Sequence, residues 1–393
     1  MPVNNRIAAM APEIAEWRQA IHANPEMGFE EHATGAMVAE KLASWGIEVH
    51  RGIAGTGLVG VLRNGVSGRS IGLRADMDCL PMTEETGLPH ASRTPGKMHA
   101  CGHDGHTAML LGAAKYLAET RNFDGTVNFL FQPAEEGGGG GRVMVEEGVF
   151  DRFPCDSVYG IHNDPSLAVG EMAVVAGPIL AAADRISIYI RGIGGHAARP
   201  HIAIDPVLIG AQLIVALQGV VSRRVDPLDS AVLSLCQFHA GSASNVIPET
   251  AEIHGTIRTL KAETRAAMQR HILRICASIG EAFEAEIRAE WKSGYPVTVN
   301  HAHETDLAAA AAARVFAPEG IIRKRPPVMG AEDFSYMLER RPGAFVKLGQ
   351  KGPDGKGGVP VHHPKYDFND DAAPYGVGFF SALVEQELPR TAS

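Results

Sequence analysis

The feature that most limits the fold of this chain is the alternation of short apolar runs with helical patterns in its first half. Apolar runs of strand length occupy residues 57–62, 70–75, 126–131 and 157–162. Helical spacing of apolar residues occurs at 6–23, 106–119 and 142–147. Strands that alternate with helices predict an α/β fold whose sheet is mainly parallel and covered on both faces.

The pattern changes near residue 183. A strand at 185–191 is followed by a long helix, by β runs at 231–238 and 250–258, and by a helix at 262–283. This β-α-β-β-α-β order predicts an inserted α+β domain of the ferredoxin-like type. The strand at 344–348 and the helix at 375–388 return to the first domain. Because 393 residues exceed the usual size of one domain, we predict one domain from 1–183 with 295–393 and another from 184–294.

Composition excludes some partners. The net charge is -9 and charged residues make up 21%, so there is no basic excess that would hold a nucleic acid. The longest apolar stretch, 207–221, is interrupted by Gln212 and Gln218 and is shorter than the ~20 residues of a membrane span. We therefore expect a buried helix there and no membrane partner.

Two features suggest a cytoplasmic protein. The N-terminal residues lack the charged and then apolar layout of a signal peptide. The five cysteines are odd in number and widely scattered, which fits a reduced compartment better than a disulfide framework.

Polar side chains follow the β runs of the first domain. Asp76 and Asp78 come after one run, Glu135 and Glu136 after the next, and His162 ends a third. Because ligands of parallel sheets bind at the carboxyl ends of the strands, we expect these residues to share one pocket.

A second group of candidates lies in residues 98–106, where Cys101-Gly102-His103 places a thiol and an imidazole on a tight turn. Alone, this pattern equally fits a buried cysteine beside a capping histidine. Further donors are available, and the candidate metal ligands are Cys101, His103, Glu136, His162 and either His362 or His363. Five ligands are too many for one tetrahedral zinc but suit two metals about 3.5 to 4 Å apart.

The two adjacent glutamates are expected to do different work, because neighbouring side chains point in different directions. If Glu136 binds metal, Glu135 is free to act as a general base and acid; the alternative is a solvated acidic turn. Asp78 is the candidate for a carboxylate that orients a metal-binding histidine, while Asp76 fits a salt bridge or turn cap equally well. The glycine run 137–141 lacks the ending of a phosphate-binding loop.

Several segments, in order along nearly the whole chain, resemble the M20 metallopeptidase family, and more closely its amidohydrolase branch of hippurate hydrolases, N-acyl-amino-acid deacylases and plant auxin-conjugate hydrolases. These segments are LRADMD (73–78), MHACGHDGH (98–106), FQPAEE (131–136), GGHAARP (194–200), NVIP (245–248) and MGAEDF (329–334).

The resemblance implies that Cys101 bridges two divalent metals and that Glu135 is the catalytic base, with Asp78 as a further catalytic residue. Alignment on Pro364 makes His362 the late ligand and places His363 at the family's usual asparagine. One thiolate among nitrogen and oxygen donors would accept manganese, zinc, cobalt or nickel, so the identity of the metal stays open.

The resemblance also implies that the inserted domain is a lid through which two copies form a homodimer. Its histidine, His196, would reach the substrate or the oxyanion, with Asn245 as its companion. Arg258 is a candidate for pairing with a substrate carboxylate, although a structural ion pair is equally plausible. Gly330 and Glu332 are expected to line the pocket wall.

The predicted activity is hydrolysis of the amide bond of an N-acyl or N-aroyl amino acid, as in hippurate, to a carboxylic acid and a free amino acid. The alternative on the same scaffold is a dipeptidase or carboxypeptidase. A metal-binding protein without turnover is disfavoured, because the chain has a candidate for the base and for every ligand.

Overall fold

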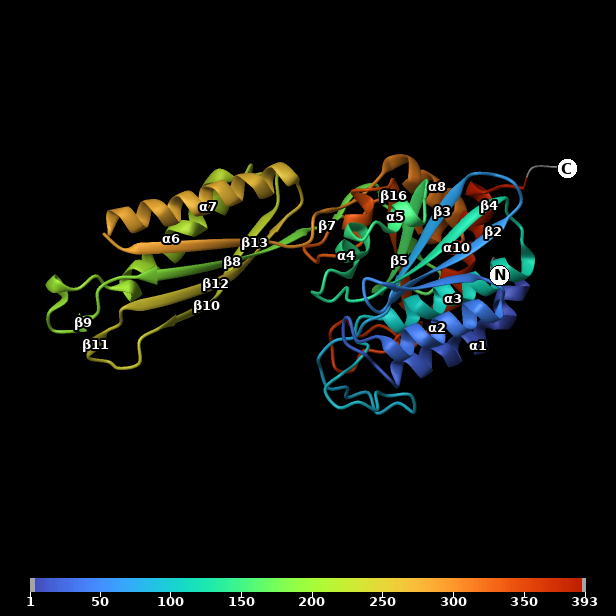
Figure 1. Ribbon diagram of the computed structural model, residues 1–393, viewed down its shortest axis with the longest axis horizontal. Helices are drawn as coiled ribbons and strands as arrows, with labels where there is room; N and C mark the ends of the chain where they lie inside the picture. The colour runs from blue at the N-terminus through green and yellow to red at the C-terminus, as the bar shows by residue number, and fades with distance from the viewer. Residues whose placement is uncertain (1–3, 391–393) are drawn as a thin grey trace. The chain divides into compact units, whose positions relative to one another are not determined.

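The computed structural model describes residues 4–390, which form two compact units (Figure 1). The first unit contains the described residues 4–177, 299–326 and 333–390, and the second contains 178–298 and 327–332. The second unit is longer than the domain predicted from 184–294. Its extra segment pairs Val328 with Leu180 in a β-bridge, and Gly330 O accepts a hydrogen bond from Ala181 N at 2.8 Å.

The first unit is built on an eight-stranded mixed sheet with the order β1-β2-β4-β3-β5-β16-β6-β15. Its strands are β1 (Glu48–Ile53), β2 (Gly57–Asn64), β3 (Ser70–Asp76), β4 (Gly125–Gln132), β5 (Ser157–Ala168), β6 (Met172–Ala173), β15 (Ile321–Ile322) and β16 (Gly343–Lys351). The four strands at the centre, β4, β3, β5 and β16, run parallel to one another. The predicted α/β class is confirmed.

Helices cover this sheet because its strands are apolar on both faces. The longer helices are α1 (Asn5–His22), α2 (His32–Ser44), α3 (His103–Thr120), α8 (Ala302–Ala312) and α10 (Ala373–Glu387), and the short ones are α4 (Gly140–Glu146), α5 (Val149–Arg152) and α9 (Ser335–Leu338). The buried residues of α1, α3 and α10 form one core with Leu73 and Ala75 of β3. Because side chains alternate along a strand, Arg74 points to the opposite face.

The second unit is a four-stranded antiparallel sheet with two helices, in the predicted β-α-β-β-α-β order. Its elements are β8 (Ala182–Arg191), α6 (Pro206–Arg224), β10 (Ala231–Ala240), β12 (Thr250–Thr259), α7 (Ala262–Ala282) and β13 (Glu286–Ser293). The strand order is β10-β12-β8-β13. Every second residue of β8 is buried, and Ile186, Ile188 and Ile190 form the core with residues of α6 and α7.

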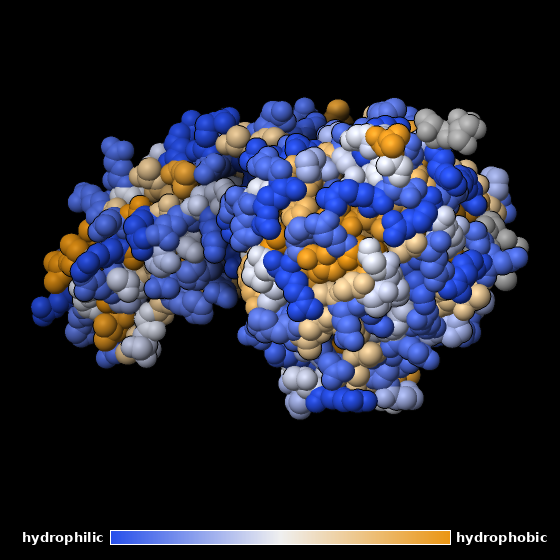
Figure 2. All heavy atoms as spheres, turned by 45° about the vertical axis from the view of Figure 1, so that its right-hand side comes forward, coloured by the Kyte–Doolittle hydropathy of each residue, from blue (hydrophilic) through white to orange (hydrophobic). Residues whose placement is uncertain are grey.

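Helix α6 is long and apolar enough to cross a membrane by length and composition, and 33% of that apolar window is buried. Ile209, Leu213 and Leu217 are buried in the core of the second unit, whereas Leu208 and Val215 are exposed. The prediction of a buried helix at 207–221 is therefore wrong for the outer side of α6, because the sheet covers one side of the helix. Figure 2 shows mostly hydrophilic atoms on the visible face, with apolar atoms in small groups between them.

Candidate metal centre

The first part of the centre is a sharp turn before α3. Gly102 has a φ of +94°, in the left-handed region that disfavours side chains. A Cβ atom at this position would lie 2.5 Å from the Tyr366 hydroxyl oxygen and would overlap Asn163 Oδ1. The glycine therefore lets the chain reverse directly into the helix, with Cys101 on one side of the turn and His103 as the first residue of α3.

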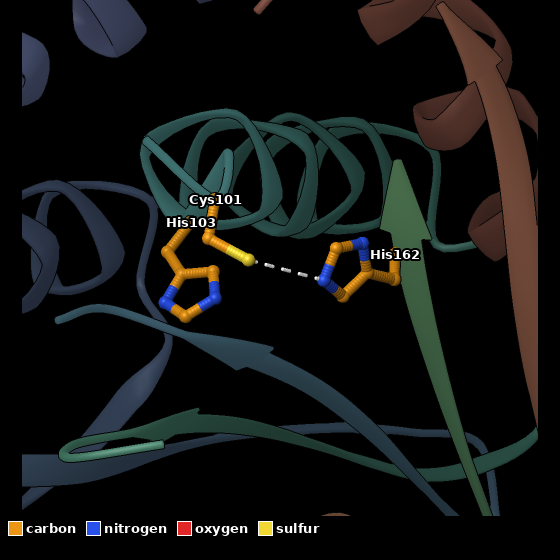
Figure 3. Close-up of side chains that lie close together, drawn as sticks. All are labelled: Cys101, His103 and His162. Carbon is orange, nitrogen blue, oxygen red and sulfur yellow. Dashed lines mark hydrogen bonds between the residues drawn. The ribbon is translucent and has the colours of Figure 1, made fainter. Parts of the chain in front are cut away.

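The turn points its thiol at the strand in the middle of the sheet. Cys101 Sγ lies 3.5 Å from Nε2 of His162, which belongs to β5 (Figure 3). His162 Nδ1 lies 2.7 Å from Asn163 O, so the proton sits on Nδ1 and the Nε2 lone pair faces the sulfur. One ligand atom each from Cys101, His103 and His162 lie within 4.8 Å of one another, which makes them a candidate metal group.

Cys101 also belongs to a second group, with Glu136 and His362, whose ligand atoms lie within 4.8 Å of one another. Glu136 Oε1 is 3.0 Å from His362 Nε2. His362 has a φ of +63°, and its backbone N–H donates to Ala100 O at 2.7 Å. Both late histidines are exposed, but His363 accepts a hydrogen bond from the backbone N–H of Lys365 and belongs to no candidate metal group among the described residues. The geometry thus places His362 with the candidate ligands.

Glu135 lies beside these groups. Its carboxylate is 6% exposed, and Oε1 accepts a hydrogen bond from Asp333 N at 3.3 Å. Ligand atoms of Glu135, Glu136 and His103 lie within 4.8 Å of one another. Both adjacent carboxylates therefore reach the same histidine, because the backbone turns sharply at Ala134, whose φ is +53°.

The two aspartates after β3 contact the histidines of α3. His103 Nδ1 lies 3.0 Å from Asp78 O and 3.2 Å from Asp78 Oδ1, and Asp78 Oδ2 accepts a hydrogen bond from Glu136 N at 2.9 Å. Asp76 Oδ1 lies 2.6 Å from Nδ1 of His106. Asp78 therefore fixes His103 so that Nε2 faces the candidate ligands. His106 is held by Asp76 and by Asn163 Oδ1, which is 2.7 Å from His106 Nε2.

Burial controls the charges of these groups. It raises the pKa of the Cys101 thiol to about 12, against the opposing effect of His103. Burial also lowers the pKa of His162 well below its usual range, and the charge of Lys347 acts in the same direction. Asp76 is fully buried, which alone would raise its pKa, but the charge of Arg74 and of the two α3 histidines holds that pKa well below the usual range.

The donor set fits a cation. Among the described residues, His103 Nε2 is buried and makes no hydrogen bond, and Glu136 Oε1, also buried, has His362 Nε2 at 3.0 Å. Unpaired polar atoms in a buried site are costly, and a metal ion would satisfy them. Thiolate, imidazole and carboxylate donors together suit first-row transition metals or zinc. Cys101 belongs to both of the groups described above and would offer its thiolate to a cation in either of them.

A buried arginine organises the base of the site and was given no role from the sequence. The Arg74 guanidinium donates to Asp76 Oδ2 at 2.7 Å, to Asp333 Oδ1 at 3.0 Å and to Gln132 Oε1 at 2.8 Å. Asp333 also accepts from Gly141 N at 2.7 Å. The signal was present in the sequence, since Arg74 is a lone charge inside the apolar run 70–75.

Two further polar residues of 98–106, His99 and Asp104, belong to no candidate metal group among the described residues. Asp104 Oδ2 lies 2.8 Å from His22 Nδ1 and 3.6 Å from Arg18 Nη1, both on α1. His99 is 1% exposed, and among the described residues neither of its ring nitrogens makes a hydrogen bond. Asp104 thus connects the start of α3 to α1.

The predicted substrate residues His196, Asn245, Arg258 and Gly330 all belong to the second unit. His196 is paired with Val246 between the short strands β9 (Gly195–His196) and β11 (Val246–Ile247), and Asn245 O accepts from Ala197 N at 3.1 Å. His196 and Asn245 are therefore neighbours, and both are exposed. Arg258 is half-buried and donates to Thr256 Oγ1 and Ile257 O. Gly330 is exposed.

The end of this α/β sheet carries candidate metal ligands of thiol, imidazole and carboxylate type beside a buried glutamate, and this combination defines a metal-dependent hydrolase. Residues 72–386 match the model of the peptidase family M20/M25/M40, and the chain belongs to this family and to its amidohydrolase branch. It is 42% identical to a hippurate hydrolase of Campylobacter jejuni over 376 residues, which cover 96% of this chain and 97% of the relative.

Two further relatives show the range of this similarity. The chain is 38% identical to thermostable carboxypeptidase 2 of Saccharolobus solfataricus over 374 residues, which cover 93% of each chain. A solved structure from Bacillus subtilis, described as a dinuclear metal-binding peptidase of the M20 family, matches with a TM-score of 0.84 and 33% identity and covers 97% of this chain and 99% of that one. The family and the hydrolase class are thus shown, while the relatives differ in substrate.

Proposed function

We propose that this protein hydrolyses the amide bond of N-acyl or N-aroyl amino acids, of which hippurate is an example, with two divalent metals bound per subunit. The observation that carries the proposal is that two candidate metal groups share Cys101, and that Glu135 forms a further group with His103 and Glu136, one residue from each of those two. This arrangement supports a bridged pair of metals with a general base beside it.

Cys101, His103 and His162 would hold one metal, and Cys101, Glu136 and His362 the other. When bound, such cations polarise a substrate carbonyl and make water more acidic. Glu135 takes the proton of the attacking water and delivers it to the departing amine. The hydrogen bond from Asp333 N keeps the Glu135 carboxylate in place for both transfers. Asp78 holds His103 in the orientation that binding requires.

The second unit is proposed to complete the site. His196 would stabilise the oxyanion with Asn245 beside it, Arg258 would pair with the carboxylate of the substrate, and Gly330 would line the pocket. We also propose a homodimer that forms through this unit. If analytical ultracentrifugation shows a monomer and that monomer has full activity, His196 does not act across subunits.

The test of the base is Glu135→Gln in metal-loaded protein. We expect the metal content to stay unchanged and kcat to fall at least ~100-fold, because the amide cannot accept the proton. Glu146→Gln is the control, since this carboxylate is exposed on α4. Retained activity in metal-loaded Glu135→Gln would contradict the assignment.

The substrate class is tested by a panel. A carboxypeptidase or dipeptidase is the second candidate, because one of the relatives is described as a carboxypeptidase. Hippurate, N-acetyl amino acids and unblocked dipeptides differ in the group beyond the scissile carbonyl. We expect the largest kcat/KM for the acylated amino acids; a preference for dipeptides would favour the second candidate. Elemental analysis, followed by reloading with manganese, zinc, cobalt or nickel, identifies the metal.

A further inference from the structure

Glu31 is a fully buried carboxylate that the proposed chemistry does not use. Its relative exposure is 0%. Glu31 Oε1 accepts a hydrogen bond from Ala134 N at 2.8 Å, and Oε2 accepts one from the Thr56 hydroxyl. These contacts join the loop before α2 to the segment after β4. Glu31 thus reaches the residue that directly precedes Glu135.

The place of Glu31 in the chain makes this contact unexpected. Glu31 is the N-cap residue of α2, yet its side chain makes no capping hydrogen bond. Glu26 does that work from outside the helix, because its carboxylate accepts from Ala33 N at 2.9 Å and from Thr34 N at 2.8 Å. Two glutamates of one loop therefore have separate tasks, and only Glu31 contacts the segment after β4.

The amide that Glu31 holds belongs to a residue in an unfavourable conformation. Ala134 has a φ of +53°, where residues with a Cβ atom are strained. The neighbouring chain is close, since a Cβ atom on Gly28 would lie 2.9 Å from Ala134 Cβ. Ala134 O accepts from Gly140 N at 3.0 Å. The surroundings hold Ala134 in place, and its conformation sets the direction in which the next two side chains leave the backbone.

A second carboxylate, that of Asp78, holds the backbone N–H of the residue that follows Glu135. Asp78 Oδ2 accepts from Glu136 N at 2.9 Å. The backbone N–H groups before and after Glu135 are therefore each held by a buried carboxylate, Glu31 on one side and Asp78 on the other. Burial raises the pKa of Glu31, against the hydrogen bonds from Thr56 and Ala134. A buried carboxylate is rarely the most stable choice for filling space, which indicates a positional task.

We propose that Glu31 is a positioning residue, which sets the direction of the Glu135 and Glu136 carboxylates by holding the Ala134 N–H. The inference rests on the proposed function of Glu135 as the base. Its physical basis is that the transfer of a proton depends steeply on geometry, so that a displacement of about 1 Å can reduce a rate ~100-fold.

Three variants of the full-length protein separate the effect of the length of the Glu31 side chain from the effect of its charge. Glu31→Gln keeps the length of the side chain and an oxygen that can accept from Ala134 N, but removes the charge. Glu31→Asp keeps the charge, but its carboxylate is one methylene shorter and does not reach Ala134 N. Glu26→Gln is the matched control, because it changes a glutamate of the same loop that caps α2 and has no contact with Ala134 among the described residues.

The first measurement is hydrogen exchange in the metal-free proteins, which does not depend on activity. In Glu31→Asp, we expect exchange to become at least ~10-fold faster in peptides that cover residues 133–141. In Glu31→Gln, the same peptides should exchange at nearly the wild-type rate. In Glu26→Gln, any faster exchange should be confined to the start of α2.

The second measurement is steady-state kinetics at saturating metal. We expect Glu31→Asp to lower kcat about 10- to 100-fold with KM changed less than ~3-fold, and Glu31→Gln to keep kcat within ~3-fold of wild type. Equal losses in the two Glu31 variants, or an unchanged kcat in Glu31→Asp despite faster exchange, would overturn the inference. If wild-type protein turns over no N-acyl amino acid, the proposed function fails, while unchanged exchange in Glu31→Asp overturns the inference independently.

Discussion

The Asp78 carboxylate lies 3.2 Å from His103 Nδ1 and the Asp78 backbone oxygen lies 3.0 Å from it, and together they fix the direction of His103 Nε2. A partner of this kind orients a ligand histidine and increases its basicity, and its loss typically weakens metal binding 10- to 100-fold. We therefore expect Asp78→Ala to raise the metal dissociation constant by about that factor, as measured by competition with a chelator. Asp151→Ala is the control, because Asp151 is exposed on α5; equal affinity in Asp78→Ala and wild type would refute the role.

Metal binding is expected to depend on pH through Cys101. Because burial raises the pKa of this thiol to about 12, the thiol is protonated at neutral pH, and a bound cation must displace the proton. Affinity should then rise at least tenfold per pH unit between pH 6 and 8, because the pKa of His103 is also raised, and binding should release at least one proton in weakly buffered solution. Affinity that stays constant over this range would show that the thiol is not a ligand. Cys101→Ser should lose most of the affinity.

Much of the first unit follows from its sequence because its elements are buried. The sequence segments of β3, β4 and β5 are nearly continuous in apolar residues. The strands predicted from them therefore overlap the observed strands and differ only in where they end. Strand β1 was not predicted, since it lies at the edge of the sheet and just one of its residues, Ile53, is buried. A half-exposed strand with polar residues carries no apolar signal.

The candidate site likewise contains residues whose role could be predicted from the sequence and residues whose role could not. Cys101, His103 and Glu136 carry side-chain types that are typical of metal ligands, so their chemistry is visible in the sequence. The role of Glu31 was not visible, because it acts on the backbone N–H of Ala134, and nearly every residue type carries such a group. Asp333 likewise holds Glu135 through a backbone N–H. Contacts of this kind depend on the fold, which brings together residues that are distant in sequence.

Arg74 is expected to be essential for stability. It is buried and pairs with Asp76 and Asp333, so Arg74→Met removes the cation that contacts both buried carboxylates. Breaking a buried ion pair from one side costs about 3 to 5 kcal/mol. We expect a loss of this size in urea unfolding of the metal-free protein. Arg142→Met is the control, because its pair with Glu146 is largely exposed and should change stability by less than ~0.5 kcal/mol. Similar losses in the two variants would contradict this account.

His22 is expected to make stability depend on pH. Burial lowers its pKa, but Asp104 and Glu84 raise the pKa to about 9, above the value of 6.5 in an unfolded chain. The folded state thus binds the proton more tightly, and the resulting stability is present below pH 6.5 and is lost as the pH rises towards 9. The change is on the order of 3 kcal/mol. Urea unfolding between pH 6 and 9.5 should show this decrease in wild type and a much smaller one in His22→Gln; equal slopes would assign the decrease to other groups.

Gly102 is expected to tolerate no side chain. Its φ of +94° is unfavourable for alanine, and the added Cβ would also collide with Asn163 Oδ1 and the Tyr366 hydroxyl. Relief of this collision moves the turn that carries Cys101 and His103. We therefore expect Gly102→Ala to lose metal affinity at least ~10-fold, as measured by chelator competition.

Gly96 provides the matched control for that substitution. Its φ is +78°, and a Cβ atom there would have no heavy atom within 4 Å, so Gly96→Ala carries the backbone strain without the collision. We expect it to lower the unfolding free energy by about 1 kcal/mol and to leave metal affinity unchanged. If Gly96→Ala and Gly102→Ala weakened metal binding equally, backbone strain would explain the effect. A loss confined to Gly102→Ala would show that the close contact with β5 and the late loop is what sets the two ligands in place.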